Sequence, residues 1–211
     1  MSDIADLGPG PGQQRAPAGL RDRARRAVRA EVAAVGFGLF AEHGFDNVTV
    51  DAIASAAGMS RTSFFRYFAT KEDVVLGHLE EMGHQLVELL AARPAGESAW
   101  LALEQAFSEL FAETLSAHDQ ALRLAKMLVE TPSLRARHLE KQQQWQDLLT
   151  PELSRRLGVP EDDPRDPRPR ALAAAALGCL DAADLAWTAS DGKADMPELI
   201  KQAMAAVRAD Q

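Results

Sequence analysis

Apolar residues recur at helical spacing along most of this 211-residue chain, and no segment alternates in the way that a strand does. Val75, Leu79 and Met82, for example, follow one another at steps of four and three. Hydrophobic residues make up 46% of the sequence, which is enough to bury a core and excludes a disordered chain. The pattern therefore predicts an all-α globular protein.

The apolar stripes, together with the residues that begin and end helices, predict a series of helices and one tail. A Gly- and Pro-rich start, residues 1–19, is expected to be a flexible tail. The helices are expected at 20–43, 50–57, 61–68, 71–93, 98–116, 119–130, 132–157, 170–190 and 196–209.

The segment between the first helix and residue 71 carries the most specific pattern. Thr49 and Ser60 are good N-caps for two short helices, and Gly58 between them favours the left-handed conformation of a tight turn. Two short helices joined in this way behind a longer helix form a helix-turn-helix. We therefore divide the chain into a tail (1–19), a helix-turn-helix domain (20–70) and a C-terminal helical domain (71–211).

Charge is distributed unevenly between these parts. The whole chain has a net charge of −8, but residues 15–71 carry +4 and residues 72–211 carry −10. A basic module on an acidic body indicates a polyanion partner, and a solvated helix face is the alternative. The arginines before and in the first helix are predicted to form an arm that enters a DNA minor groove; they are Arg15, Arg21, Arg23, Arg25, Arg26 and Arg29.

The run GMSRTSFFRYFATKEDV at 58–74, preceded by Phe45-x-x-Val-Thr-Val-x-x-Ile-Ala-x-x-Ala, resembles the DNA-binding module of the TetR family of bacterial transcriptional regulators. The resemblance covers residues 21–75. It implies a three-helix head whose second short helix enters the major groove. Arg61 and Arg66 are suited to guanine edges or phosphates, and short side chains beside them let the helix sit deep in the groove. The residues expected to contact DNA are Thr49, Ser60, Arg61, Thr62, Ser63, Arg66, Tyr67 and Lys71.

Two positions depart from the usual form of the family. Thr62 stands where many members have Gly, and Phe65 stands where many have Tyr, so no phosphate contact is assigned to Phe65. The aromatic residues Phe64, Phe68 and Tyr67 have a second interpretation as anchors in the core of the head.

From Arg123 onward the chain is similar to actinobacterial members grouped with the mycofactocin-system regulator and with acyl-CoA-responsive repressors. This similarity implies an effector-binding C-terminal domain and a homodimer formed by helices 170–190 and 196–209. The small residues of 170–190 suit close approach of two helices, although they suit packing within one chain as well. A twofold dimer would match a palindromic operator in double-stranded DNA.

An effector pocket for a small apolar or acyl-type molecule is expected among helices 98–157 and the start of 170–190. Large, adaptable side chains line such pockets, although each could also belong to the ordinary core. The candidates are Trp100, Phe107, Phe111, Met127, His138, Trp145 and Trp187.

Other function classes find less support. His78 and His84 are six residues apart and do not share a helix face as a zinc pair would, so no metal and no cofactor are expected. Asp181 and Asp184 share a face but lack a base or metal partner, and we expect them to be solvated or salt-bridged. The single cysteine, Cys179, and the absence of a secretory signal favour the cytoplasm, and no membrane partner is expected. The alternative function is a helical small-molecule-binding or enzymatic protein that no longer binds DNA.

Overall fold

The computed structural model describes residues 18–113, 118–160, 163 and 165–208. Within them the chain forms ten helices and no strand, which confirms the all-α prediction. Most of the predicted flexible tail, residues 1–17, lies outside the described part. The helices are α1 (Ala18–His43), α2 (Val50–Ala56), α3 (Arg61–Phe65), α4 (Glu72–Leu76), α5 (His78–Ala92), α6 (Ala99–Glu113), α7 (His118–Glu130), α8 (Pro132–Leu157), α9 (Arg168–Ala189) and α10 (Met196–Arg208).

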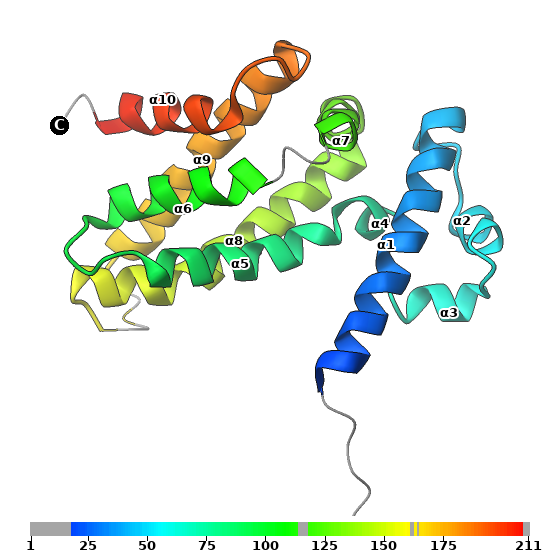
Figure 1. Cartoon of the computed structure of the whole chain (residues 1–211), viewed down its shortest axis with the longest axis horizontal. Coiled ribbons are helices and arrows are strands. Elements are labelled where there is room, and N and C mark those ends of the chain that lie inside the picture. The colour runs from blue at the N-terminus through cyan, green and yellow to red at the C-terminus, as the bar shows by residue number, and fades with distance from the viewer. Residues whose placement is uncertain (1–17, 114–117, 161–162, 164, 209–211) are drawn as a thin grey trace, which may run out of the picture.

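Helices α1, α2 and α3 form a small head at one end of the molecule (Figure 1). The expected caps are present: Thr49 Oγ1 accepts a hydrogen bond from the Ala52 N–H at 3.1 Å, and Ser60 Oγ accepts one from the Ser63 N–H at 3.1 Å. Gly58, in the turn between α2 and α3, has a φ of 66°, which a side chain would strain. The helix-turn-helix geometry predicted for this segment is confirmed.

Two helices in this region differ from the prediction. Helix α3 ends at Phe65 rather than at residue 68, because the N–H groups of Tyr67 and Phe68 both bond to the Phe64 carbonyl in a closing turn. The helix predicted over 71–93 is divided at Gly77 into α4 and α5. Arg29 of α1 donates a hydrogen bond to the Gly77 carbonyl at 3.2 Å, so a tertiary contact marks the division.

A first hydrophobic core, called here the head core, lies between α1, α2, α3 and α4. Phe64 and Phe68 are buried in it, which confirms their interpretation as anchors, and Tyr67 packs against it half-buried. Leu134 of α8 also belongs to this core and ties the head to the rest of the chain. Its buried members are Val32, Phe40, Phe45, Val48, Ile53, Ala54, Phe64, Phe68, Val74, Val75, Leu76 and Leu134.

A second core fills the C-terminal bundle of α5, α6, α8, α9 and α10, where α9 lies against both α8 and α10 (Figure 1). Gly83 of α5 allows this bundle to close, because a Cβ there would lie 2.6 Å from the indole Nε1 of Trp145 on α8. Cys179 is buried in the same core, where burial raises the pKa of its thiol, and it is an unreactive packing residue.

Among the described helices, α9 is the one that is long and apolar enough to cross a membrane by length and composition. Its buried residues, including Ala176, Leu180 and Trp187, belong to the C-terminal core. A buried helix of a bundle meets the same criteria, so we interpret α9 as a core helix.

Candidate functional site

The residues expected to contact DNA lie around the start of α2 and along α3, with Lys71 just before α4. Thr49, Ser60, Arg61, Thr62 and Arg66 are exposed to solvent. Ser63, Tyr67 and Lys71 are half-buried. The head therefore presents a polar surface, formed mainly by α3, on the side opposite its core.

Arg61 is held in place by two neighbours on this surface. Its Nη1 lies 2.8 Å from a carboxylate oxygen of Asp51 on α2, and its guanidinium lies 5.6 Å from the ring centroid of Phe65. Both Arg61 and Asp51 are well exposed, so this ion pair contributes little to stability but restricts the arginine side chain. Phe65, to which no contact was assigned from sequence, is 46% exposed beside it.

Lys71 has a structural contact in addition to the phosphate contact expected of it. Its Nζ donates a hydrogen bond to the Phe45 carbonyl at 2.7 Å and lies 4.2 Å from the Phe45 ring centroid. An ammonium has three donors, so a phosphate contact still fits this geometry.

The prediction of a flexible arginine arm is wrong for most of the segment concerned. Helix α1 begins at Ala18, so the arginines from Arg21 to Arg29 belong to a helix rather than to a flexible segment. Arg29 is also half-buried and bound to Gly77. Arg15, the remaining member, lies outside the described residues.

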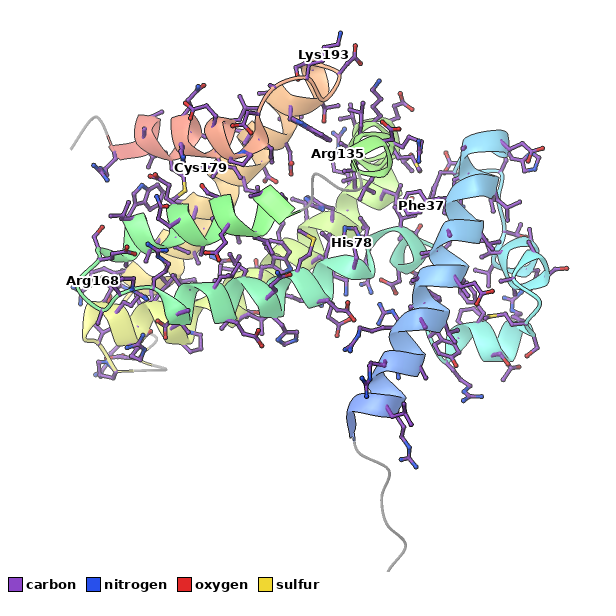
Figure 2. All side chains as sticks on the ribbon, in the orientation of Figure 1. Phe37, His78, Arg135, Arg168, Cys179 and Lys193 are labelled. Atoms are coloured by element: carbon purple, nitrogen blue, oxygen red, sulfur yellow. The ribbon has the colours of Figure 1, made fainter. Side chains whose placement is uncertain are left out.

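A cavity of about 640 Å³ lies where the C-terminal bundle meets the head. Its wall comes mainly from α5, α7, α8 and α9, and it reaches α1 through Phe37 and α4 through Leu76. Figure 2 shows Phe37, His78 and Arg135 gathered at this junction. Most of the lining is apolar, and the volume is that of a site for a drug-sized molecule.

The structure brings four of the seven predicted pocket residues to this cavity, namely Phe111, His138, Trp145 and Trp187. The prediction is corrected for the other three, which do not line it. Phe107 is fully buried in the C-terminal core, and the Trp100 indole donates a hydrogen bond to the Met204 carbonyl of α10 at 3.3 Å. Met127 of α7 packs against the head core and does not line the cavity.

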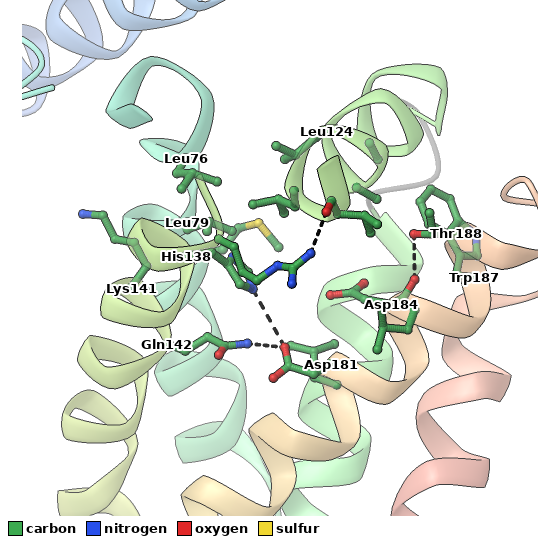
Figure 3. A pocket seen from close by; sticks show the side chains of 18 of the residues that line it. Leu76, Leu79, Leu124, His138, Lys141, Gln142, Asp181, Asp184, Trp187 and Thr188 are labelled. Atoms are coloured by element: carbon green, nitrogen blue, oxygen red, sulfur yellow. Dashed lines mark hydrogen bonds and ion pairs between the residues drawn. The ribbon is translucent and has the colours of Figure 1, made fainter. Parts of the chain in front are cut away.

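A polar cluster interrupts the apolar lining where α8 faces α9 (Figure 3). Asp181 has two partners: the Gln142 side-chain amide donates a hydrogen bond to its Oδ1, and His138 Nε2 lies 3.8 Å from the same oxygen. The other ring nitrogen of His138, Nδ1, is buried without a hydrogen-bond partner in the described residues. His138 therefore meets the cluster through Nε2.

Asp184, one turn further along α9, is in a different situation. Its backbone carbonyl accepts a hydrogen bond from Thr188 Oγ1 at 2.8 Å, but within the described residues its carboxyl group accepts none. Desolvation in the cavity wall raises the pKa of this carboxyl group to about 7, helped by the negative charge of Asp181 and opposed by His138. Asp184 is thus a desolvated acid that lacks a donor.

The remaining ionisable groups of the wall already have contacts or lie away from Asp184. The surrounding protein lowers the pKa of His78 by desolvation, although its Nδ1 lies 3.1 Å from the Val75 carbonyl, which opposes the shift. Arg135 donates a hydrogen bond to the Val129 carbonyl at 2.6 Å. Lys141 extends to the side of α8 away from Asp181 (Figure 3).

Sequence reasoning missed Asp181, Asp184 and His78 as parts of this cavity. The two aspartates were expected to be solvated or salt-bridged. This is confirmed for Asp181, which lies 3.8 Å from His138 Nε2, but Asp184 has no such partner in the described residues. The sequence does contain one indication: both aspartates lie on one face of an otherwise Ala- and Leu-rich helix. Acidic residues on such a helix must face either solvent or a cavity.

An ion pair connects the cavity region to the head. Asp73 of α4 is 6% exposed and lies 3.0 Å from the guanidinium of Arg137 on α8, next to His138. Asp73 also forms a reciprocal cap with Thr70: the Thr70 N–H donates to the Asp73 carboxylate at 3.1 Å, and Thr70 Oγ1 accepts from the Asp73 N–H at 3.2 Å. The start of α4 is therefore bound firmly to α8.

Two family models match the sequence. Residues 33–77 match the bacterial regulatory proteins of the tetR family, and residues 97–210 match the MftR C-terminal domain. The first match covers the helix-turn-helix, and the second covers most of the C-terminal bundle.

Characterised proteins and solved structures agree with these models. The chain is 35% identical to the HTH-type transcriptional regulator TcmR of Streptomyces glaucescens, over 74% of this chain and 71% of that protein. It is 30% identical to the HTH-type transcriptional repressor AcnR of Corynebacterium diphtheriae, over 59% of this chain and 63% of that protein. Among solved structures, FadR of Thermus thermophilus, a TetR-family repressor in complex with lauroyl-CoA, has a TM-score of 0.53 and 25% identity, covering 83% of this chain and 91% of that one.

Proposed function

The chain belongs to the TetR family of bacterial transcriptional regulators, and from this premise we propose that it is a cytoplasmic repressor that a small apolar or acyl-type effector releases from its operator. The proposal rests most on one observation: α3 presents Arg61, Thr62 and Arg66 to solvent from a head that shares the wall of an apolar cavity through Phe37. The relatives and matched domains are those of regulators, which excludes the enzymatic alternative.

The DNA-binding part of the proposal places α3 in a major groove. Arg61 and Arg66 would contact guanine edges or phosphates, and Thr62 and Ser63 would let the helix approach the bases. Thr49, Ser60, Tyr67 and Lys71 would contact phosphates and set the register of the head without reading sequence.

The dimer would form through α9 and α10. An exposed stripe of small residues runs along α9, and it includes Ala174, Gly178 and Ala182. Val207 of α10 is 47% exposed and would add apolar area. A twofold dimer places its two α3 helices in half-sites separated by about 34 Å, one turn of DNA, and so requires a palindromic operator.

Release would follow from the contact between cavity and head. An effector in the cavity would touch Phe37 and Leu76, and its differential affinity for two positions of the head sets how far it can shift DNA binding. The relative FadR was solved with lauroyl-CoA, which supports an acyl-type effector as one candidate.

Fluorescence anisotropy tests the proposal directly. The purified protein is titrated against DNA that flanks its own gene and against a scrambled duplex, each at two salt concentrations. We expect a preference for the flanking DNA that persists at the higher salt and is weakened by acyl or apolar compounds. Equal, salt-sensitive binding to both duplexes, with no preferred site elsewhere in the genome, would instead favour a small-molecule-binding protein that has lost its operator.

A further inference from the structure

Two groups in the polar cluster of the cavity have incomplete hydrogen bonding in the described residues: Nδ1 of His138 and the carboxyl group of Asp184. Asp181 is bound by Gln142 and His138, whereas the carboxyl group of Asp184 accepts no hydrogen bond within the described part of the chain. Asp184 is half-buried in the cavity wall. A partly desolvated polar group without a partner costs free energy, and a bound molecule that supplies a donor recovers it. Asp184 is therefore an acceptor in the wall to which a donor group of a ligand can bind.

The charges around Asp184 restrict what that polar end can be. Asp181 stands one turn away on the same face of α9, so an anion placed against this wall meets two acids. The cations of the wall do not offset this. Arg135 keeps its charge although it donates to the Val129 carbonyl, and Lys141 extends away from Asp181 (Figure 3), but neither is among the charges that shift the pKa of Asp184. His138 is the cation-forming group that does, and its effect opposes the desolvation. A carboxylate or phosphate is thus disfavoured at α9, while a hydroxyl or an ammonium group has an acceptor there.

The rest of the wall requires an apolar body. Leu79, Met82, Phe111, Leu124, Trp145 and Trp187 surround the cluster. The indole N–H of Trp145 already donates to the Leu79 carbonyl at 2.7 Å, so this ring offers its apolar face and no donor to a ligand.

We propose that the effector is an apolar molecule that presents a hydrogen-bond donor, a hydroxyl or a protonated amine, to Asp184, and that an anionic head group is rejected there. This inference rests on the proposed function, because it concerns the effector cavity of the same regulator. It makes Asp184 the residue that determines specificity within an otherwise apolar site.

Three probes with the same tail separate the head groups: 1-decanol, decylamine and decanoate, measured by isothermal titration calorimetry with the full-length protein at pH 7.5. We expect the alcohol or the amine to bind at least about tenfold more tightly than decanoate, since a hydrogen bond to a charged group changes affinity by about that factor or more. In Asp184→Leu the affinities for 1-decanol, decylamine and decanoate should differ by no more than about threefold. Asp184→Asn keeps a carbonyl acceptor, so it should bind 1-decanol about as tightly as the wild type does. It should no longer bind decylamine more tightly than 1-decanol, because the negative charge is gone.

Several results would overturn the inference. Decanoate binding as tightly as the other probes, an unchanged preference in Asp184→Leu, or no binding of any probe would each do so. Operator binding by the wild type and by Asp184→Leu, followed in parallel by anisotropy, keeps this result separate from the proposed function. If operator binding persists while the head-group preference is absent, only the inference about Asp184 fails. If the wild type binds no operator, the proposed repressor function fails whatever the probes show.

Discussion

The head and the proposed effector cavity use polar residues in opposite ways. In the head, the core is apolar, and the charged groups stand on the outer surface or bind to backbone carbonyls, as Lys71 does with Phe45. In the cavity, ionisable groups such as Asp184 face inward with incomplete hydrogen bonding. The polar groups of a surface that contacts DNA can be fully solvated before binding. In a cavity that discriminates between small molecules, a polar group can instead lack a hydrogen bond until a ligand supplies it.

The largest effect is expected from removing an anchor of the head core. Phe64→Ala deletes a fully buried ring and should lower the free energy of unfolding of the head by about 3–5 kcal/mol. DNA binding should be lost, because α3 is positioned by this ring. Urea denaturation followed by circular dichroism, with operator anisotropy, measures both effects. Phe65→Ala is the matched control: its ring is exposed, so a comparable loss of stability there would contradict the distinction between core and surface.

The next largest effect is expected from breaking the ion pair that connects the head to the cavity region. Arg137→Leu leaves the buried carboxylate of Asp73 without its ion-pair partner, although the Thr70 cap remains, and should cost about 1–3 kcal/mol of stability. Because this pair joins α4 to α8, effector and operator binding should also become less coupled. Operator titrations with and without effector measure that coupling. Arg137→Lys retains the charge and should keep part of the coupling between effector and operator binding. Undiminished coupling in Arg137→Leu would exclude the Asp73–Arg137 ion pair as its route.

On the outer surface, the effect should appear in DNA affinity rather than in stability. Arg61→Ala should weaken operator binding by about 1–3 kcal/mol and relax specificity at one base pair, with little change in unfolding, because the Asp51 pair is exposed. Anisotropy with operator variants measures the loss. Arg21→Ala, on an exposed part of α1, is the control; an equal loss there would mean that Arg61 contributes only general charge.

A smaller effect, of about 1 kcal/mol, is expected from the ionisation of Asp184 as pH changes; the full difference in pKa would give about 4 kcal/mol, but Asp184 is half-buried, so solvent screens most of it. Its pKa is about 7 in the folded chain against an ordinary 3.8, so the native state holds the proton more tightly than the unfolded chain does. The free energy of unfolding contributed by this group therefore falls as pH rises from near 3.8 to about 7. Asp184→Asn cannot ionise and should be more stable than the wild type at pH 8, but not at pH 4. Thermal unfolding at the two pH values checks the sign, and equal differences at both would exclude Asp184 as the cause.

The smallest effect is expected from deleting residues 1–17. This segment contains one arginine, Arg15, against Asp3 and Asp6, so it is not basic as a whole. Affinity for an operator with A·T-rich flanks should change by less than about threefold. The slope of log K against log salt concentration should change by about one at most. A tenfold loss of affinity would restore a role for the segment as an arm.

Local chemistry made much of the fold predictable. The caps at Thr49 and Ser60 and the left-handed Gly58 depend on neighbours a few residues away, and the sequence patterns located them correctly. The division at Gly77 did not follow from local pattern, because the side chain that binds its carbonyl, Arg29, is 48 residues away.

The same limit applies to the cavity. Large side chains were expected to line it, but whether Met127 or Leu128 of α7 faces the cavity depends on how that helix is rotated against α8. Asp181 and Asp184 could be paired by their spacing, but their environment is set by residues from α8, which no pattern within α9 specifies.

Phe37 has a consequence for how proteins of this kind are recombined. This residue belongs to α1 of the head and yet forms part of the cavity wall. A chimaera that joins this C-terminal bundle to the head of a relative would replace a piece of the proposed effector site together with the proposed DNA-reading helix. Inducer response and promoter choice are thus not freely exchangeable modules in this chain, and a sensor built by head exchange should keep the phenylalanine at this position of the transplanted first helix.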